Sequence, residues 1–449
     1  MDAPKVYIRS HRLLSQMHRS IVYPLHPRQL NGEELAPRPT ILGACALFFA
    51  IVLFVRCPAT ILHPRFWAED SVIWYSDAYT IGSLSLFSPQ AGYLQTISRL
   101  VALVAQGFPL QWAPALFVAT ALIIQTLTAT FLVSRRMSSV WPSLWGRFLF
   151  AFIYVALPNS LETHLNLTNE QWHLAILSFF ILVGRPPESR LGRAGDVIAL
   201  ALSGLSGPFC LLLMPIALWQ LRDDRSTAQV QRAAIVAITC IIQGGFLIAT
   251  VGHNRSPAAL GASGSTLARI IVVQILLGGL LGVRVTSHLT NLAPLNSDEV
   301  VMAIALGGLL LCAVVLWQGP SVLRKAALFG GLVLAASLWR PQVSTTEPQW
   351  SVMTNLYAGQ RYYLIPILVW TSLVLSFAAD HNRKLRYLAL PLVGLLFVGV
   401  AADWSYPRLP ATDFSERAQE FADAPPGTRV EFASRPPHFA PMILVKHGP

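Results

Sequence analysis

The apolar residues of this 449-residue chain fall into long runs separated by short polar stretches. A helix that spans a bilayer needs about 20 mostly apolar residues, with about 17 to 25 as the usual range. Runs of this kind recur from residue 41 to residue 402, which predicts an all-α polytopic membrane protein with about 11 transmembrane helices. The predicted spans are 41–57, 112–134, 147–158, 170–184, 195–205, 208–221, 233–251, 299–317, 325–339, 362–379 and 387–402.

Two further apolar segments are not counted as full crossings, because only then do all the basic loops lie on the same side of the membrane. Residues 92–109 carry Gln95, Arg99 and Gln106 among apolar positions, which favours an amphipathic helix lying at the membrane interface. Residues 267–285 are apolar enough to span. We expect a peripheral or re-entrant helix there.

The apolar stretch 199–219 is interrupted by Gly204, Gly207 and Pro208. Two short helices that meet at an irregular turn fit this pattern, and such interrupted helices often mark binding sites in membrane proteins. A simple proline kink within one long helix fits it equally well.

Composition supports the membrane assignment, since 54% of the residues are hydrophobic, only 12% are charged and the mean hydropathy is +0.52. The net charge of +11 does not indicate nucleic-acid binding, because the basic residues lie in short clusters between the apolar runs. Cytoplasmic loops collect Lys and Arg. Placing six such clusters inside accounts for 20 of the 33 basic residues and orients the whole chain.

The two ends differ from the apolar middle at 41–402. Residues 1–40 form a basic cytoplasmic segment, too long for a simple secretory signal, so 41–57 is expected to be a retained first span. Residues 403–449 predict a small extracytoplasmic α+β tail, with a helix in "FSERAQEFADA" and strands in "RVEFAS" and "MILVKH". The spacing of the five cysteines is not that of metal ligands or of a disulfide framework. We interpret them as small core residues.

The first outer loop, 58–111, contains an acidic pair, Glu69 and Asp70, among aromatic residues. Adjacent carboxylates repel, and burial among aromatic rings penalises their charge further, so one of them is expected to have a raised pKa. A carboxylate tuned in this way can act as a general base. Capping of an interfacial helix explains the pair as well.

A late outer loop ends in "RYYLIP", with Arg361 followed by Tyr362 and Tyr363. A guanidinium makes forked, permanently charged contacts to phosphate, so these residues are candidates for binding a lipid phosphate. An ordinary belt of interfacial aromatic and basic residues is the simpler explanation.

A polar cluster precedes the fourth span, in "NLTNEQWH" at 166–173. Asn169, Glu170 and His173 are candidates for hydrogen bonding to a polyhydroxylated ligand. A Glu and a His on one helical face are weak evidence for a metal site without a third ligand. Arg65 and Trp67, which precede the acidic pair, complete the candidate substrate-binding set.

Taken together, these features resemble the GT-C superfamily of integral membrane glycosyltransferases, which use polyprenyl-phosphate-linked sugars. The resemblance rests on a first span, a long outer loop with an acidic pair, a span pair broken at "GLSGPF…LLLMP" and the late "RYYLIP". It covers about residues 41–402 and is one of layout with loose motifs.

The resemblance implies a function and roles for particular residues. An acid in the first outer loop deprotonates the acceptor, which falls on Asp70 with Glu69 as partner or substitute, and a late Arg contacts the donor phosphate, which falls on Arg361. Many members have Asp before Glu, whereas this chain has Glu before Asp, so the choice of base stays open.

The implied reaction is inverting transfer of a hexose or pentose to a glycan or lipid acceptor of the cell envelope. It implies a bacterial inner membrane protein whose site faces the extracytoplasmic side. Some relatives use a divalent metal, Mg²⁺ or Mn²⁺, and this sequence does not require one.

Two other classes compete with this interpretation. A lipid-carrier flippase or secondary transporter also has broken helices, but it usually carries ionisable groups inside its spans. A polysaccharide polymerase or ligase of another membrane fold is the nearer rival. A late outer loop rich in Arg is typical of that class, and residues 340–361 contain two.

Overall fold

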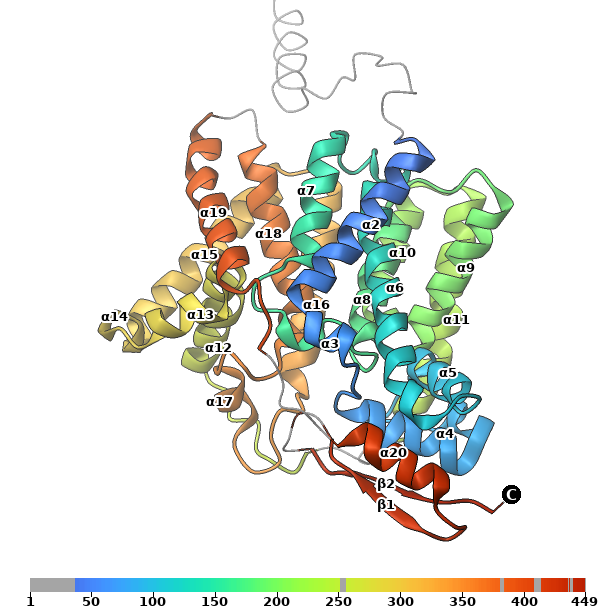
Figure 1. Cartoon of the computed structure of the whole chain (residues 1–449). Coiled ribbons are helices and arrows are strands. Elements are labelled where there is room, and N and C mark those ends of the chain that lie inside the picture. Colours follow the sequence, from blue (N-terminus) through green and yellow to red (C-terminus); the bar gives the residue numbers. More distant parts are fainter. Residues whose placement is uncertain are drawn as a thin grey trace, which may run out of the picture.

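The computed structural model describes residues 37–250, 256–379, 383–407, 413–434, 436 and 439–448. Within these ranges the protein is mostly helical, with a bundle of long helices and a small two-stranded sheet near the C-terminus (Figure 1). Most of the basic segment 1–40 lies outside the described residues.

The bundle is built from fifteen helical segments in the described part of the chain. They are α2 (Pro39–Arg56), α6 (Ala113–Val133), α7 (Leu144–Val155), α8 (Glu170–Val183), α9 (Arg190–Leu205), α10 (Phe209–Asp223), α11 (Thr227–Ala249), α12 (Gly264–Ile270), the π-helix η6 (Ile271–Leu277), α13 (Gly278–Thr290), α14 (Ala293–Asn296), α15 (Asp298–Gln318), α16 (Ser321–Trp339), α18 (Leu364–Ala378) and α19 (Arg383–Ala402).

Shorter elements gather mainly at the lower end of the molecule in Figure 1. They are α3 (Pro58–Leu62), the π-helix η1 (Asp70–Tyr75), α4 (Ser76–Ile81), α5 (Thr96–Ala105), α17 (Gln349–Met353) and α20 (Phe414–Asp423), the 3₁₀ turns η2 (Gly82–Phe87), η3 (Leu110–Trp112), η5 (Leu161–Thr163) and η7 (Gln360–Tyr363), and the strands β1 (Arg429–Phe432) and β2 (Met442–Val445). A further 3₁₀ turn, η4 (Arg135–Met137), follows α6.

Six helices in the described ranges are long and apolar enough to cross a membrane. They are Pro39–Arg56, Leu110–Val133, Thr227–Ala249, Gly264–Thr290, Ser321–Trp339 and Gln360–Ala378. Their outward side chains are apolar too: Ile241 and Ile248 of α11 are 75% and 77% exposed. Continuous exposed apolar surface of this kind is stable against lipid rather than water. The protein is therefore an integral membrane protein.

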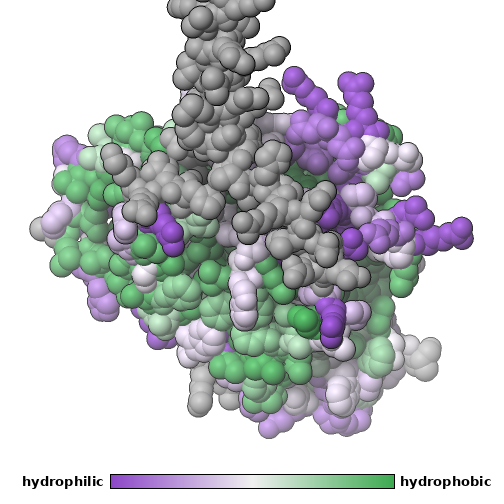
Figure 2. Space-filling model, turned by 90° about the horizontal axis from the view of Figure 1, so that it is seen from above, coloured by the Kyte–Doolittle hydropathy of each residue, from purple (hydrophilic) through white to green (hydrophobic). Residues whose placement is uncertain are grey.

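One end of the bundle collects several of the described basic residues predicted to share a side; we call it the basic end. Arg136, after α6, and Arg232, in α11, both bind the carboxylate of Asp196 in α9, at 2.6 Å and 2.8 Å. Lys325 of α16 binds Asp223 of α10 at 2.7 Å. Seen from this end, hydrophilic side chains project on one side while the flanks are largely hydrophobic (Figure 2). The opposite end we call the cavity end.

The interrupted stretch at 199–219 forms two helices, as one of the two interpretations predicted. Helix α9 ends at Leu205 and α10 begins at Phe209, so a single kinked helix is wrong. The carbonyl oxygens of the turn are used within the protein: Thr96 donates to that of Leu205 at 2.8 Å and Gln243 to that of Gly207 at 3.3 Å. Irregular backbone at this depth is thereby satisfied.

The segment predicted as peripheral or re-entrant, 267–285, lies within Gly264–Thr290, and 72% of its apolar window is buried, so it is not peripheral. The segment bends at Gly282, where φ is +75°. Past the bend the chain returns to where it began, because Arg269 of α12 donates to the carbonyl of Leu295 at 3.0 Å and pairs with Asp298 at 3.0 Å. This return agrees with the re-entrant alternative.

The bend at Gly282 is held by Asp403, just beyond α19. Its carboxylate accepts hydrogen bonds from the backbone N–H of Asn159 at 3.0 Å and of Val283 at 2.7 Å. A Cβ at Gly282 would lie 2.6 Å from that carboxylate, and the positive φ disfavours any other residue. The anion also faces the N-terminus of the helical segment after the bend, where negative charge is favourable.

The segment predicted as an interfacial amphipathic helix, 92–109, contains α5, which is ten residues long. Its polar side turns into the protein rather than toward lipid headgroups: Arg99 is 1% exposed, pairs with Asp77 at 2.9 Å and lies over the Trp74 ring. Burying a guanidinium requires such partners, so α5 is integrated into the loop that carries the acidic pair.

The C-terminal appendage, as far as it is described between residues 413 and 448, has the predicted helix and two strands. Strands β1 and β2 pair antiparallel, with Val430 opposite Leu444. Their buried side chains join α20 in one apolar cluster with residues of the first outer loop, including Phe66 and Trp74. The appendage therefore packs against that loop (Figure 1).

Candidate functional site

A cavity of about 1290 Å³ opens at the cavity end. Its lining comes from six parts of the chain: the first outer loop at 67–95, residues 161–172, the start of α10 with Leu247 of α11, residues 256 and 257, the region 333–362, and Pro436, Phe439 and Ala440 of the appendage. Four non-glycine residues with positive φ, Ala68, Ala91, Asn159 and Leu165, lie in or beside these parts. Such backbone costs about 1–3 kcal/mol per residue and clusters at functional sites.

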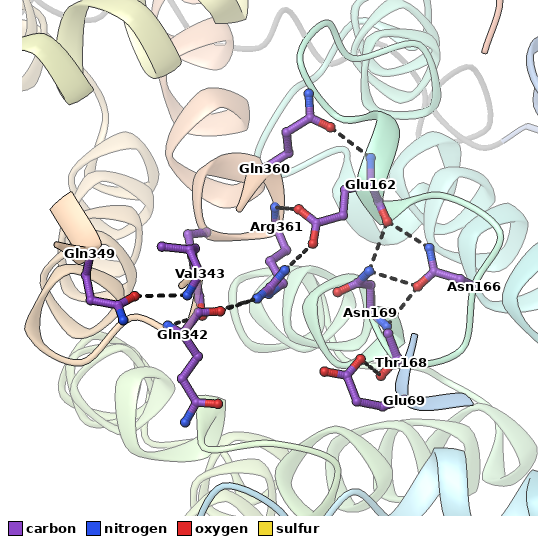
Figure 3. Close-up of polar contacts among 11 residues, drawn as sticks. Glu69, Glu162, Asn166, Thr168, Asn169, Gln342, Val343, Gln349, Gln360 and Arg361 are labelled. Atoms are coloured by element: carbon purple, nitrogen blue, oxygen red, sulfur yellow. Dashed lines mark hydrogen bonds and ion pairs between the residues drawn. The ribbon is translucent and has the colours of Figure 1, made fainter. Parts of the chain in front are cut away.

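Glu69 lines this cavity. Its Oε2 accepts a hydrogen bond from the hydroxyl of Thr168 at 3.2 Å (Figure 3), and that hydroxyl accepts one from the indole N–H of Trp74 at 3.1 Å. The carboxylate is thus oriented by a short chain of polar contacts while remaining partly exposed.

Asp70 does not line the cavity and is 1% exposed. Its Oδ2 accepts hydrogen bonds from the backbone N–H of Trp67 at 3.3 Å and of Leu167 at 3.4 Å. Burial, together with the negative charge of Glu69, raises the pKa of Asp70 well above its usual value despite these bonds. Asp70 therefore joins the first outer loop to the loop before α8, whereas Glu69 faces the open space.

Arg361 lines the same cavity and forms an ion pair with Glu162 (Figure 3). The Arg361 backbone N–H also donates to Glu162 Oε2 at 3.2 Å, and its guanidinium donates to the carbonyl of Gln342 at 3.0 Å. The guanidinium carbon lies 4.7 Å from the ring centre of Tyr362. The cation is held at the cavity wall by contacts on several sides.

Sequence reasoning missed Glu162. The available signal was its position in a polar stretch, "NSLETHLNL", between two predicted spans on the outer side. Gln360 Oε1 accepts a hydrogen bond from the Glu162 backbone N–H at 2.9 Å. Glu162 also lines the cavity, so a second carboxylate faces it beside the guanidinium.

The remaining predicted residues divide into two groups. Trp67, Asn169 and Tyr362 line the cavity. Asn169 donates to the carbonyl of Glu162 at 2.9 Å and to Asn166 Oδ1 at 2.8 Å, and the Tyr362 hydroxyl accepts from the Gln342 N–H at 3.0 Å.

The other predicted residues do not line it. Tyr363 is buried and donates to the carbonyl of Met353 at 3.1 Å. Glu170 and His173 are fully buried: Glu170 accepts from Gln125 at 2.5 Å and His173 contacts the Tyr154 hydroxyl at 2.6 Å. Arg65 lies in a small separate crevice with Phe66 and Ser71.

A buried amide hub holds the loops of the site together. Asn159 donates to the carbonyl of Gln274 in η6 at 2.9 Å and accepts from Gln360 at 2.8 Å. Gln274 in turn donates to the carbonyls of Met353 and Asn355 at 2.8 Å and 2.7 Å. The re-entrant segment therefore supports the loops that carry Glu162 and Arg361.

The cavity lining combines charged and apolar side chains. Glu69, Glu162, Arg340 and Arg361 supply charge, and we call the part around Glu69, Glu162 and Arg361 its charged end. We call the apolar lining from α10, α11 and α16 the apolar arm; it consists of Leu211, Leu212, Leu247, Val333 and Ala336. A cavity of this type fits an amphipathic ligand with a charged head and an apolar chain.

The arrangement of potential metal ligands can be described from the structure. In the ranges that the structure describes, no group of three or more His, Cys, Asp and Glu side chains is arranged to hold a metal ion. Glu69 and Glu162 are the carboxylates on the cavity wall.

No family model, curated protein or solved structure matches this chain.

Proposed function

We propose that this protein is a membrane glycosyltransferase of the GT-C type, which transfers a hexose or pentose from a polyprenyl-phosphate donor to a cell-envelope glycan or lipid. The observation that carries the proposal is the single cavity in which a carboxylate, Glu69, and a guanidinium, Arg361, share a space with an apolar arm. The charged end suits a sugar phosphate, and the arm between α10 and α16 suits the polyprenyl chain.

The reaction is a direct displacement with inversion. The acceptor hydroxyl oxygen forms a bond to the anomeric carbon, the bond from that carbon to the phosphate oxygen breaks, and polyprenyl phosphate leaves. Glu69 takes the hydroxyl proton as general base. Arg361 stabilises the negative charge that develops on the leaving phosphate as the sugar becomes oxocarbenium-like.

In this proposal Asp70 positions the base rather than acting as one. Its hydrogen bonds to Trp67 and Leu167 close the turn that presents Glu69. Assigning the base to Asp70, the other alternative left by the sequence, requires the proton to reach a carboxyl group that is 1% exposed. If an Mg²⁺ or Mn²⁺ ion assists the phosphate, Glu69 and Glu162 are the lining carboxylates available to it.

The proposed topology has eleven crossings with the N-terminal segment in the cytoplasm of a bacterial cell and the cavity on the extracytoplasmic side of the inner membrane. Support comes from the ion pairs of Arg136, Arg232 and Lys325 at the basic end and from the cavity at the opposite end. Helices α7 to α10 have 12 to 16 residues, so their crossings require local thinning of the bilayer.

Sugar transfer by the purified protein tests this proposal. Synthetic polyprenyl phosphates carrying different hexoses and pentoses are offered with mixed octyl glycosides as acceptors, and wild type is compared with Glu69→Gln and Arg361→Ala. Glu420→Gln, on the exposed face of α20, is the matched control. We expect transfer by wild type and the control, and its loss in the other two variants. Movement of the donor across a vesicle membrane without any transfer would instead identify a flippase.

A further inference from the structure

The appendage contributes to the cavity as well as packing on the outer loop. Pro436, Phe439 and Ala440, between its two strands, line the same cavity as Glu69 and Arg361. No role was assigned to this part of the chain on sequence grounds. We propose that the C-terminal appendage forms the acceptor-side wall of the cavity and that Phe439 is a specificity-determining residue for the acceptor sugar. This inference rests on the proposed transferase function.

The position of the wall follows from contacts on either side of it. The Ser434 hydroxyl lies 3.2 Å from that of Ser71, which follows Glu69 and Asp70 directly in the chain. Phe432 and Met442 belong to the apolar cluster that contains Phe66 of the same loop. Pro436, Phe439 and Ala440 therefore approach the cavity from the side of Glu69.

That side is the one an acceptor must use. A general base takes a proton only from a group within about 2.6–3.2 Å of it, directly or through one water molecule. The acceptor hydroxyl therefore lies against Glu69, while the donor phosphate lies against Arg361 and its chain in the apolar arm. A wall next to Glu69 contacts the acceptor first.

The side chains on the Glu69 side of the cavity suit a carbohydrate. Aromatic rings of Trp67, Trp74, Tyr93 and Phe439 line the cavity. Amide side chains that can bind sugar hydroxyls accompany them, at Gln90, Gln95, Asn169 and Gln171. Pockets in which a few polar groups orient a ligand against aromatic surface select ligands by shape as well as by hydrogen bonds. A sugar ring has an apolar face of C–H groups that can pack on the Phe439 ring.

The appendage is held firmly enough to act as a wall. The backbone N–H of His447 donates to the Tyr79 hydroxyl at 3.1 Å, and the two rings stack with their centres 4.3 Å apart. Phe414 of α20 packs edge-on against Phe66 at 5.7 Å. These contacts fix the appendage to the outer loop on both sides of the cavity-lining stretch.

The test compares Phe439→Ala with Ile443→Ala in the full-length protein. Ile443 lies in the same hairpin but is 41% exposed and does not line the cavity. Three quantities are measured: the KM for octyl β-glucoside as acceptor, the rate of sugar release to water, and the affinity for sugar-free polyprenyl phosphate.

For Phe439→Ala we expect an increase of about tenfold in acceptor KM, equivalent to about 1.4 kcal/mol. Release to water and binding of polyprenyl phosphate should stay close to wild type, and Ile443→Ala should change none of the three. An unchanged acceptor KM overturns the proposal. A rise in acceptor KM that is accompanied by similar losses in sugar release and in affinity for polyprenyl phosphate also overturns it, because it indicates a purely structural role.

Failure of the transferase proposal is distinguishable from failure of this one. If wild type neither transfers nor hydrolyses any donor, binding of octyl β-glucoside is compared directly by saturation-transfer NMR. Weaker binding to Phe439→Ala than to wild type and Ile443→Ala supports the wall. Equal binding by all three proteins refutes it.

Discussion

The two ends of the bundle place the same types of charged residue in different surroundings: one set is largely buried, and the other lines a cavity. At the basic end, Arg136 and Arg232 share the carboxylate of Asp196, whose side chain is 8% exposed. At the cavity end, the pair of Arg361 and Glu162 and the neighbouring Glu69 line an open cavity. Charge and pairing therefore do not distinguish a candidate binding site from an ion-pair cluster that only stabilises the fold. The distinguishing feature is access to a space that a ligand can enter.

The largest effect is expected at the cavity end, when the carboxylate of Glu69 is removed. Glu69→Gln should lower the transfer rate by about 10²- to 10⁴-fold, the usual contribution of a general base. Thermal unfolding in detergent should stay close to wild type, because the Glu69 carboxylate is partly exposed and accepts a single side-chain hydrogen bond, from Thr168, within the described part of the chain. Full turnover in a folded Glu69→Gln protein contradicts the assignment.

The corresponding variant at the basic end removes the carboxylate of Asp196. Asp196→Asn leaves two guanidinium groups near each other without their shared anion, and breaking a buried charge pair costs about 3–5 kcal/mol. We expect a clear fall in the unfolding temperature, measured by tryptophan fluorescence, with normal turnover for each molecule that remains folded. A stable variant with lost turnover would reverse the roles of the two ends.

A matched pair of arginine variants sharpens the comparison. Arg361→Ala should reduce transfer by about 10²- to 10³-fold, as expected when a group that stabilises a developing anion is removed. Arg136→Ala should leave the turnover of the folded fraction unchanged, since Arg136 contacts Asp196 and the carbonyl of Arg185. Initial rates at saturating donor distinguish them, and equal losses count against a role for Arg361 at the phosphate.

The smallest expected effect concerns Asp70 and pH. Its pKa is raised in the folded protein, so the unfolded chain loses the proton first as pH rises above about 4. Wild-type stability should therefore fall by about 1.4 kcal/mol for each pH unit between the unfolded and folded pKa values. Asp70→Asn should lack this component. Chemical denaturation at about pH 4.5 and 5.5 measures it, and identical slopes for both proteins rule it out.

The helical class, the membrane-spanning character and the grouping of polar residues could be predicted because they depend on local pattern. Eleven spans were predicted, whereas six helices in the described ranges are long and apolar enough to cross. Apolar run length and the positions of basic loops were enough to group Arg136, Arg232 and Lys325 at one end and Glu69 with Arg361 at the other. The break between α9 and α10 was visible in its Gly and Pro residues. The helix and strands of the appendage followed from amphipathic and alternating patterns.

The fine structure of the site depends on long-range contacts that no local pattern contains. Which of two adjacent carboxylates faces the cavity depends on the turn at Ala68, where φ is +48°. The pairing of Glu162 with Arg361 joins residues 199 positions apart. The hub at Asn159 and the docking of the appendage likewise depend on tertiary packing, so sequence reasoning did not find them.

The carboxylate of Asp403 sets a limit on how the appendage can be removed in the laboratory. This residue follows α19 directly, yet its side chain holds the bend at Gly282 and the backbone of Asn159. A truncated protein that ends before it loses an anchor of the re-entrant segment as well as the appendage. Deletion variants that keep residue 403 separate the two effects, and those that do not will confuse misfolding with altered recognition.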